Sequence, residues 1–377
     1  MKTILPRHAA LAALLAPSLF APSLFAGPAM AQSARSADAA PPPPPPASAT
    51  MPARTAPDMQ LVLDQLAVLG AKPVETLTPA QARANPSAAD AAKAAMARQG
   101  LPTAPDASVT TMDKPYGSDA QQFARIYKPA AAPAGGKPMP VIVYYHGGGW
   151  VIATVDTYDA APRLLAKQLN AIVVSVEYRH APEFKFPAQH DDAFAAYRWV
   201  LKNAAAGGGD PAKIALAGES AGGNLAVATA IYARDNKLTR PVHILSVYPI
   251  ANSSMTLPSR VDSANAKPLN TAMLGWFGYY YSTTKADQMD PRIDLVKADL
   301  KALPPTTIVN AQIDPLRSDG ETLAAAMRAA GDTVEQRTFP GVTHEMFGMG
   351  AVVRGAHDAN TYAIGKLRTA FAMPVKR

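Results

Sequence analysis

The sequence contains no cysteine among its 377 residues. Disulfide bonds, thiolate catalysis and cysteine-ligated metal sites are therefore excluded, and so is a lipid anchor attached through cysteine. Apolar residues make up 48% of the chain and charged residues only 17%. A chain of this length and composition can form one large core, so a single folded domain is the simplest organisation.

Basic residues are in excess but do not cluster. The formal net charge is +7, yet Lys2 and Arg7 lie in a segment that we expect to be removed. The remaining lysines and arginines form neither a basic patch nor a stripe interleaved with aromatic residues. A mildly basic surface explains this balance, and we expect no nucleic-acid partner.

The chain also lacks an uninterrupted apolar run long enough to span a membrane. A short basic start, Met1–Arg7, is followed by an apolar stretch at 9–25 and by Ala29-Met30-Ala31. This layout is typical of a secretory signal peptide, here residues 1–31, cleaved before Gln32. A membrane anchor is the alternative, but prolines interrupt the stretch and a spanning helix needs roughly 20 residues. We expect an exported protein, periplasmic or secreted, without stable membrane insertion after cleavage.

Residues 32–57 are rich in proline, alanine and serine, with six consecutive prolines at 41–46. Such a composition cannot form a packed core and favours an extended, disordered linker. Leucines at helical spacing begin after this stretch. We therefore expect the folded domain to cover residues 58–377.

The apolar pattern of the folded region indicates an α/β fold. Residues 58–70 predict an amphipathic helix, and 78–99 contain an alanine-rich one. Predicted strands are FARIYK at 123, VIVYY at 141, AIVVSVEY at 171, KIALAG at 213, HILSVY at 243, TTIVNA at 306 and TVEQRTF at 333, with predicted helices near 157–169, 188–204, 221–235 and 319–330. This alternation predicts a mainly parallel sheet with helices on both faces, in which ligands bind at the carboxyl ends of the strands.

The segment Gly218-Glu219-Ser220-Ala221-Gly222 follows one predicted strand and opens a predicted helix. A nucleophile elbow needs this setting, because flanking glycines permit the sharp turn that lifts a serine hydroxyl above the sheet. The pentapeptide alone is weak evidence, since a glycine-rich turn whose serine caps a helix has the same pattern.

A second motif strengthens the first. His146-Gly147-Gly148-Gly149-Trp150 directly follows the strand VIVYY, upstream of the serine. Consecutive glycines let backbone N–H groups approach a developing oxyanion closely, and this motif is typical of lipases and esterases. The two motifs in this order favour a serine hydrolase.

The remaining catalytic candidates follow from chain order, because in such a fold the serine is followed by an acid and then a histidine. His344 lies in a loop after a predicted strand, whereas His357 lies in a polar stretch before the final helix. Asp314 comes just past the carboxyl end of TTIVNA. Asp319 competes with it, although Asp319 would begin a helix and complement the helix dipole. We predict a triad of Ser220, Asp314 and His344.

At these residues the sequence resembles the hormone-sensitive lipase family, which includes many bacterial carboxylesterases. The resemblance covers nearly all of residues 58–372. It rests on HGGGW at 146, EYRHAPEFKFPAQHDD at 177, GESAGGN at 218, LPPTTIVNAQIDPLRSDGE at 303 and AAGDTVEQRTFPGVTHEMFG at 329. It implies the α/β-hydrolase fold, with Ser220 as nucleophile, Asp314 as acid and His344 as base.

The same resemblance implies how the site is completed. The oxyanion hole would be formed by the N–H groups of Gly148, Gly149 and Ala221, with His146 holding the glycine loop in shape. Gly147, Gly218, Glu219 and Gly222 are the other supporting positions of the two motifs.

A helical cap over the site is also implied, corresponding here to residues 58–100 and about 251–290. We expect aromatic side chains of the second segment to lie over the triad and to favour short to medium acyl esters. These aromatic residues are Trp276, Phe277, Tyr279 and Tyr280.

The sequence departs from the common family pattern at three positions. Glu219 stands where aspartate is frequent, Ser318 where an acidic residue is usual, and Glu345 where glycine follows the histidine. None of these is a triad residue, so substrate preference is affected more than activity. We expect a further set of residues to brace the loops near the elbow: Tyr178, Arg179 and Glu183.

These expectations describe hydrolysis of a small-molecule ester through an acyl-enzyme, with no metal or organic cofactor. An amidase or another acyl hydrolase with the same triad is an open alternative, because the constellation specifies only acyl transfer. A catalytically silent scaffold is disfavoured by the complete triad and glycine loop. The pattern leaves the oligomeric state open.

Overall fold

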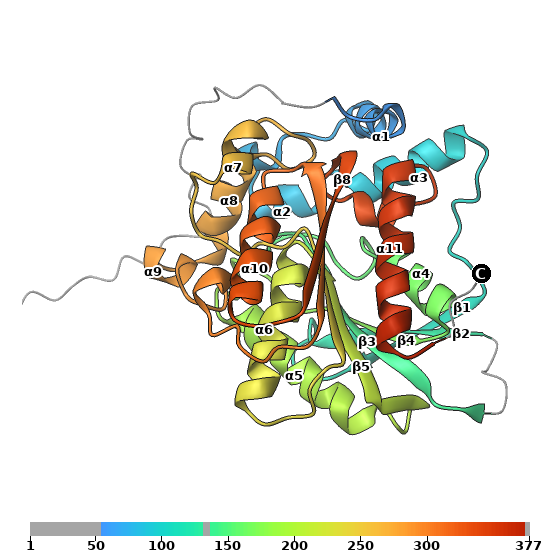
Figure 1. The fold of residues 1–377 in the computed structure, drawn as a ribbon. Coiled ribbons are helices and arrows are strands. Elements are labelled where there is room, and N and C mark those ends of the chain that lie inside the picture. Colours follow the sequence, from blue (N-terminus) through green and yellow to red (C-terminus); the bar gives the residue numbers. More distant parts are fainter. Residues whose placement is uncertain (1–53, 131–135, 374–377) are drawn as a thin grey trace, which may run out of the picture. The chain divides into compact units, whose positions relative to one another are not determined.

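The computed structural model describes residues 54–130 and 136–373. This part of the chain contains an eight-stranded sheet in the order β1-β2-β4-β3-β5-β6-β7-β8 (Figure 1). The β1–β2 and β2–β4 pairs are antiparallel, and the other neighbours are parallel. The predicted mainly parallel sheet is confirmed.

The strands reproduce the predicted order with one addition. They are β1 Val109–Pro115, β2 Phe123–Pro129, β3 Met139–Tyr145, β4 Ile172–Val176, β5 Gly209–Glu219, β6 His243–Val247, β7 Thr306–Ile313 and β8 Val334–Thr343. Strand β1 is the addition, and no pattern predicts it, because only Val109 of this edge strand is buried and its residues do not alternate between apolar and polar.

The helices fall into two groups. Those against the sheet are α4 Ala160–Leu169, α5 Ala188–Asn203, α6 Ala221–Asp235, α10 Arg317–Ala329 and α11 Arg354–Ala370. The others are α1 Pro57–Val68, α2 Pro79–Arg83, α3 Ala88–Arg98, α7 Pro258–Asp262, α8 Thr271–Tyr281 and α9 Lys285–Gln288, with short 3₁₀ turns η1 Val74–Thr76, η3 Leu295–Lys297 and η4 Met346–Met349.

The sheet separates two apolar cores. Along β3, Val141, Val143 and Tyr145 belong to the core that includes residues of α5 and α6, whereas Ile142 and Tyr144 belong to the core that includes residues of α4 and α11. Every residue of β3 is buried, and full burial of a valine or isoleucine side chain contributes about 1.5–3 kcal/mol. The two helical layers are visible on either side of the sheet in Figure 1.

The alanine-rich helix predicted within 78–99 is α3, and a separate short helix, α2, precedes it in the same range. Each begins with its own capping box, in which Thr78 pairs with Gln81 and Ser87 pairs with Asp90. Pro86 directly precedes the second cap, and a proline disfavours helical geometry at the residue before it. The break turns the chain between the two helices.

The folded region begins earlier than the predicted boundary at residue 58, because Arg54 to Pro57 of the predicted linker belong to it. Helix α1 starts at Pro57, where the missing N–H of proline costs nothing. The N–H of Ala56 donates to the carbonyl of Gly341 at 2.8 Å. The rest of the predicted linker and the predicted signal peptide lie outside the described residues.

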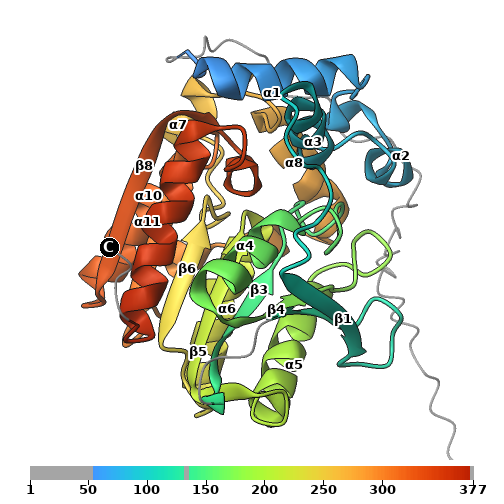
Figure 2. The same cartoon turned by 90° about the vertical axis from the view of Figure 1, so that its right-hand side faces the viewer.

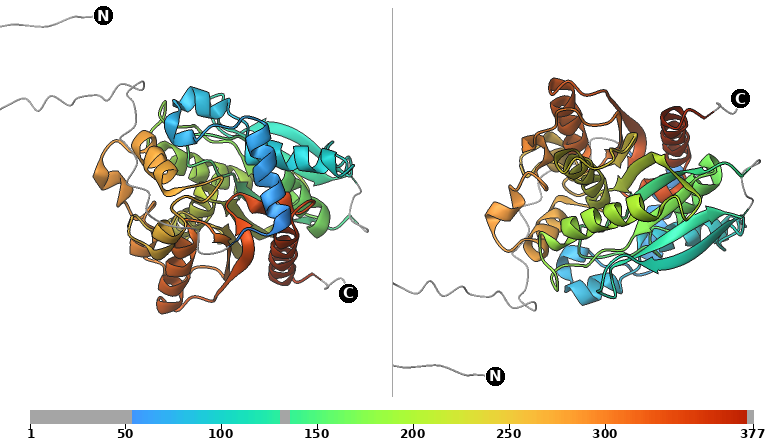
Figure 3. Two further views of the ribbon diagram at one scale, coloured as in Figure 1. Left: turned by 90° about the horizontal axis from the view of Figure 1, so that it is seen from above. Right: turned by 90° about the horizontal axis from the view of Figure 1, so that it is seen from below.

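Helices α1 to α3, α7 and α8 gather at one end of the sheet (Figures 1 and 2), and α1 crosses over that end when it is viewed from above (Figure 3). Two contacts join segments that are far apart in the sequence. Trp276 Nε1 donates to the carbonyl of Leu77 at 2.8 Å, and Asn270 Nδ2 donates to Glu75 Oε1 at 2.7 Å. Within the described residues, no helix combines the length and apolar character needed to cross a bilayer.

Candidate active site

Ser220 lies in a strained turn between β5 and α6. Its φ of 57° and ψ of −118° are sparsely populated for a residue with a side chain, a conformation that costs on the order of 1–3 kcal/mol. The Ser220 N–H donates to the carbonyl of Val247 at 2.9 Å. A Cβ atom at Gly222 would lie 1.9 Å from the carbonyl oxygen of Tyr145. Glycine is therefore required there, because the turn is pressed against the end of β3.

The structure brings the three predicted triad residues together. His344 Nδ1 lies 2.8 Å from Asp314 Oδ2, and His344 Nε2 lies 3.0 Å from Ser220 Oγ. A carboxylate can only accept, so Nδ1 carries the proton and Nε2 is left to accept from the serine hydroxyl. Asp314 is held in turn by the N–H of Leu316, which donates to Oδ1 at 2.8 Å.

The two competing candidates lie elsewhere. Asp319 is buried beside Arg260, whose Nη2 donates to both carboxylate oxygens at 2.8 and 3.0 Å. Burial raises the pKa of Asp319 to about 6, against the opposing charge of Arg260. The backbone N–H groups of Ala251 and Asn252 also donate to Asp319, each at 3.1 Å. His357 is exposed on α11. The bonds of Asp319 thus connect α10 to the segment after β6, and neither Asp319 nor His357 takes part in the triad.

The glycine loop after β3 is fixed by its own backbone and by Tyr178. Gly148 has a φ of 93°, and its carbonyl accepts from the N–H groups of Val151 and Ile152. His146 Nδ1 donates to the carbonyl of Gly147 at 2.8 Å. Tyr178 Oη donates to the carbonyls of His146 at 2.9 Å and of Gly147 at 3.2 Å. These bonds hold the loop against Tyr178, the second residue after the end of β4.

The other residues predicted to brace these loops form ion pairs. Arg179 Nη2 lies 2.7 Å from Asp192 Oδ1. Glu183 pairs with Arg83 at 2.6 Å. Glu183 does not line the cavity that contains Ser220, so its contacts are structural.

Acidic side chains with tyrosine partners lie near His344, forming a network that the sequence motifs do not indicate. Tyr144 and Tyr248 donate to the two oxygens of buried Glu219. Tyr158 Oη donates to Glu345 Oε1 and Oε2 at 2.6 and 2.7 Å. Tyr248 follows the carboxyl end of β6, so the strand-end rule points to it, whereas Tyr158 lies in a loop that carries no such signal.

Glu345 itself adopts a left-handed conformation with a φ of 69°. That conformation is uncommon for residues other than glycine. Glu345 Oε1 lies 3.9 Å from His344 Nε2. The departure from glycine at this position therefore brings a carboxylate close to the imidazole.

The pKa of His344 reflects these neighbours. Burial by itself lowers the pKa, but the charge and hydrogen bond of Asp314 and the charges of Glu345 and Glu219 outweigh it, so the pKa is raised above its usual value. Burial raises the pKa of Glu219 to about 7, although its tyrosine partners oppose the change. By contrast, burial lowers the pKa of His146 to about 4. His344 is thus the histidine of the site that is stabilised in its protonated form.

A cavity of about 280 Å³ opens over Ser220 and His344. Gly148 and Gly149 line it, together with residues of both predicted cap segments, among them Leu63, Met273 and Phe277. A Cβ atom at Gly149 would lie 2.2 Å from Phe277 Cδ1, so the aromatic ring lies directly on the glycine loop.

The expected placement of the cap aromatics is only partly right. Phe277 lines the cavity, but among the residues that the structure describes Trp276, Tyr279 and Tyr280 do not. The indole of Trp276 instead bonds to Leu77 and joins the two cap segments. At helical spacing the four residues cannot all point in one direction. Periodicity alone does not indicate which face of α8 lines the cavity and which packs against the other cap segment.

Comparison with known proteins gives concordant matches. A family model described as alpha/beta hydrolase fold matches residues 142–348. Carboxylesterase NlhH of Mycobacterium tuberculosis is 41% identical over 236 residues, which cover 62% of this chain and 74% of that protein. An ethyl acetate hydrolase of Pseudomonas putida is 33% identical over 229 residues, covering 60% and 72% of the two chains.

Solved structures agree with these matches. The hyperthermophilic esterase from the archaeon Pyrobaculum calidifontis superposes with a TM-score of 0.72 at 31% identity, covering 85% of this chain and all of that one. A mutant of the esterase rPPE gives a TM-score of 0.76 at 27% identity, covering 87% of this chain and all of that one. The expected α/β-hydrolase fold is thus confirmed.

Replacing Glu345 with Gln should lower the pKa of His344. The substitution removes a negative charge near Nε2 that favours the imidazolium ion. The measurement is an NMR titration of the His344 ring in the wild type and the variant. The matched control is Glu335→Gln, which removes an exposed carboxylate of β8 that pairs with Lys366 of α11 and should leave the pKa of His344 unchanged. An unchanged His344 titration in Glu345→Gln would contradict the electrostatic role of Glu345.

Proposed function

We propose that this chain, which belongs to the alpha/beta hydrolase fold family and is a carboxylesterase of the hormone-sensitive lipase type, cleaves short to medium acyl esters with Ser220 as its nucleophile. The observation that carries this proposal is the position of His344, with Asp314 at 2.8 Å on one side and Ser220 at 3.0 Å on the other. Ser220 and His344 line a cavity that the glycine loop also borders.

The acylation step follows from the geometry. Ser220 Oγ attacks the ester carbonyl carbon while His344 Nε2 accepts the hydroxyl proton. Asp314 keeps the imidazole in the tautomer that leaves Nε2 free, and it stabilises the imidazolium that forms. The raised pKa of His344 has the same physical origin, because nearby carboxylates favour the charged ring.

The oxyanion of the tetrahedral intermediate would be bound by the N–H groups of Gly148, Gly149 and Ala221. Two features support this assignment. Gly148 and Gly149 line the cavity beside Ser220, and Ala221 is the first residue of α6, where the helix dipole favours negative charge. Donors fixed before reaction stabilise developing charge without reorganising, which is worth about 2.7–4 kcal/mol for one such donor.

Collapse of the intermediate transfers the proton from His344 to the alcohol and leaves an acyl group on Ser220. A water molecule activated by His344 then attacks the acyl carbon, and the acid is released. His344 is the proton acceptor in each attack and the proton donor in each collapse.

The cavity supports the proposed substrate size. Its volume of about 280 Å³ lies just below the roughly 300–1,000 Å³ of typical ligand sites. Phe277 and Met273 present apolar surface to it. The relative named as an ethyl acetate hydrolase is consistent with a preference for short acyl groups here.

Ser220→Ala should reduce kcat for p-nitrophenyl butyrate by on the order of 10⁶, as loss of a triad nucleophile does in a serine protease. It should also abolish labelling by a fluorophosphonate probe. Circular dichroism and urea unfolding would verify that the variant is folded. Substantial turnover by folded Ser220→Ala protein would refute the assignment.

Asp314→Asn should lower kcat by on the order of 10⁴, because the imidazole loses the group that sets its tautomer. Asp319→Asn is the matched control. It should cost stability, by about 3–5 kcal/mol for breaking a buried ion pair, while the folded enzyme retains most of its kcat. Kinetics combined with urea unfolding would separate the two effects. If Asp319→Asn lost more kcat than Asp314→Asn, the acid would be misassigned.

Among p-nitrophenyl esters, kcat/KM should rise from acetate to an optimum between about four and eight acyl carbons. Each methylene buried against the apolar lining contributes about 0.8 kcal/mol, or roughly fourfold, until the cavity is full. Phe277→Ala should move the optimum to longer chains, because it removes the ring that lies on Gly149. A maximum at sixteen carbons in the wild type, or activation at an oil–water interface, would identify a true lipase instead.

We also propose that the first 31 residues are a signal peptide that directs export of the protein. Protein recovered from the periplasm or the culture medium should begin at or near Gln32, following the small residues at 29–31. Edman sequencing or mass spectrometry of the N-terminal peptide provides the measurement. A membrane-bound chain that still begins at Met1 would favour the anchor instead.

A further inference from the structure

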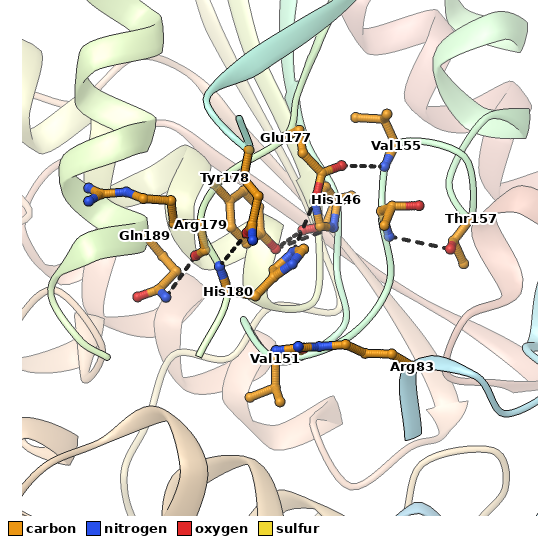
Figure 4. Close-up of polar contacts among 12 residues, drawn as sticks. Arg83, His146, Val151, Val155, Thr157, Glu177, Tyr178, Arg179, His180 and Gln189 are labelled. Carbon is orange, nitrogen blue, oxygen red and sulfur yellow. Dashed lines mark hydrogen bonds and ion pairs between the residues drawn. The ribbon is translucent and has the colours of Figure 1, made fainter. Parts of the chain in front are cut away.

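Three buried side chains converge behind the glycine loop, outside the ester cavity. Glu177 Oε1 lies 3.4 Å from His180 Nε2 and 3.8 Å from His146 Nε2. The ligand atoms of all three residues lie within 4.8 Å of one another. The residues are only 0, 4 and 6% exposed for His146, Glu177 and His180. Figure 4 shows the two imidazoles and the carboxylate directed toward one another.

The sheet places two of these groups side by side. Strands β3 and β4 are parallel, and their last residues, Tyr145 and Val176, are partners in the register. His146 and Glu177 follow directly and therefore leave the sheet at the same level. His180 follows within the same loop, where its N–H donates to Gln121 Oε1 at 2.9 Å.

The hydrogen bonds of His146 and Glu177 leave a lone pair of each residue facing the centre of the cluster. His146 Nδ1 donates to the carbonyl of Gly147, so Nε2 of the neutral ring is unprotonated. Glu177 Oε2 accepts from the N–H of Val155 at 2.8 Å, which turns Oε1 toward the histidines. Within the described residues, Nε2 of His146 and Nε2 of His180 have no hydrogen-bond partner. Buried polar atoms without a partner are rare and call for an explanation.

The protein supplies no cation to this centre from the residues that the structure describes. The neighbouring guanidinium of Arg83 donates to the carbonyls of Val151 and Ala181 and pairs with Glu183. A proton on Glu177 would satisfy only one imidazole, and a water molecule donates only two hydrogen bonds. A divalent cation can accept lone pairs from all three residues at once.

We propose that His146, Glu177 and His180 bind one divalent transition-metal ion, for which Zn²⁺ is the best-matched candidate. Zinc binds imidazole nitrogen and carboxylate oxygen at about 2.0–2.2 Å, so the ligand atoms of a tetrahedral site lie roughly 3.4 Å apart. Glu177 Oε1 lies 3.4 and 3.8 Å from the two histidine nitrogens, and all three ligand atoms lie within 4.8 Å of one another, so the side chains would have to draw closer together around one ion. The bonds from His146 Nδ1 and to Glu177 Oε2 are the outer contacts that orient metal ligands.

The ion would have a structural role. None of the three ligands is among the described residues that line the ester cavity. The ion would instead fasten the start of the glycine loop, at His146, to the segment after β4. Because the cluster is buried, we expect the ion to be acquired as the chain folds.

The test is metal analysis of the full, tag-free protein. Plasma mass spectrometry of protein produced with added Zn²⁺ should find one zinc ion per chain after exhaustive dialysis. Refolding with Co²⁺ should give the visible absorption bands of a tetrahedral site. His180→Leu and Glu177→Gln should each weaken Zn²⁺ binding, measured against a chromophoric chelator, by more than the roughly 10–100-fold that loss of an outer contact costs.

Controls separate this cluster from adventitious binding. His357→Leu removes an exposed histidine and should keep the full zinc content. Zinc should raise the melting temperature of refolded wild-type protein but not that of His180→Leu, in which leucine fills the same buried space. If His180→Leu does not fold, Glu177→Gln provides the same comparison. Wild-type protein without stoichiometric metal after refolding with Zn²⁺, or variants that retain it, would overturn the proposal. These readouts do not depend on esterase activity.

Discussion

The parallel register of β3 with its two neighbours is the constraint on which the site depends. Tyr145 is level with Val176 of β4 on one side and with Gly218 of β5 on the other. The glycine loop, the Glu177 segment and the serine turn therefore all leave the sheet at one level. The serine turn packs closely against the end of β3, because the Tyr145 carbonyl leaves no room for a methyl group at Gly222. A slip of one residue in β3 would move the glycine loop away from the serine.

A second feature of the site is the number of acidic groups around one histidine. Asp314, Glu219 and Glu345 all raise the pKa of His344. Leaving the buried carboxylate of Glu219 unpaired would be costly, and tyrosine hydroxyls donate to it and to the partly exposed carboxylate of Glu345. Tyrosine donates a hydrogen bond without adding positive charge, so the negative potential at the imidazole is retained. Lysine or arginine partners would cancel that potential.

The sequence predicted those parts of the structure that depend on local pattern. Ser220, Asp314 and His344 each follow a strand end in the expected order, and the structure brings them together. The network of Tyr158 and Glu345 was not predicted, because these residues are far apart along the chain and neither has a distinctive neighbour. The edge strand β1 was missed because its side chains are mostly exposed. The His146, Glu177 and His180 cluster depends on strand register, which a single sequence does not give.

The start of the folded region has a consequence for the histidine loop. The Ala56 N–H is bonded to Gly341, just before His344, and Asp58 Oδ2 accepts from the N–H of Arg354, where α11 begins. The first residues of the folded region thus bond to the chain both before and after the segment that carries His344. Proteolytic trimming that stops before residue 54 would keep both hydrogen bonds. Trimming into α1 would remove them and leave the loop that carries His344 without these two contacts.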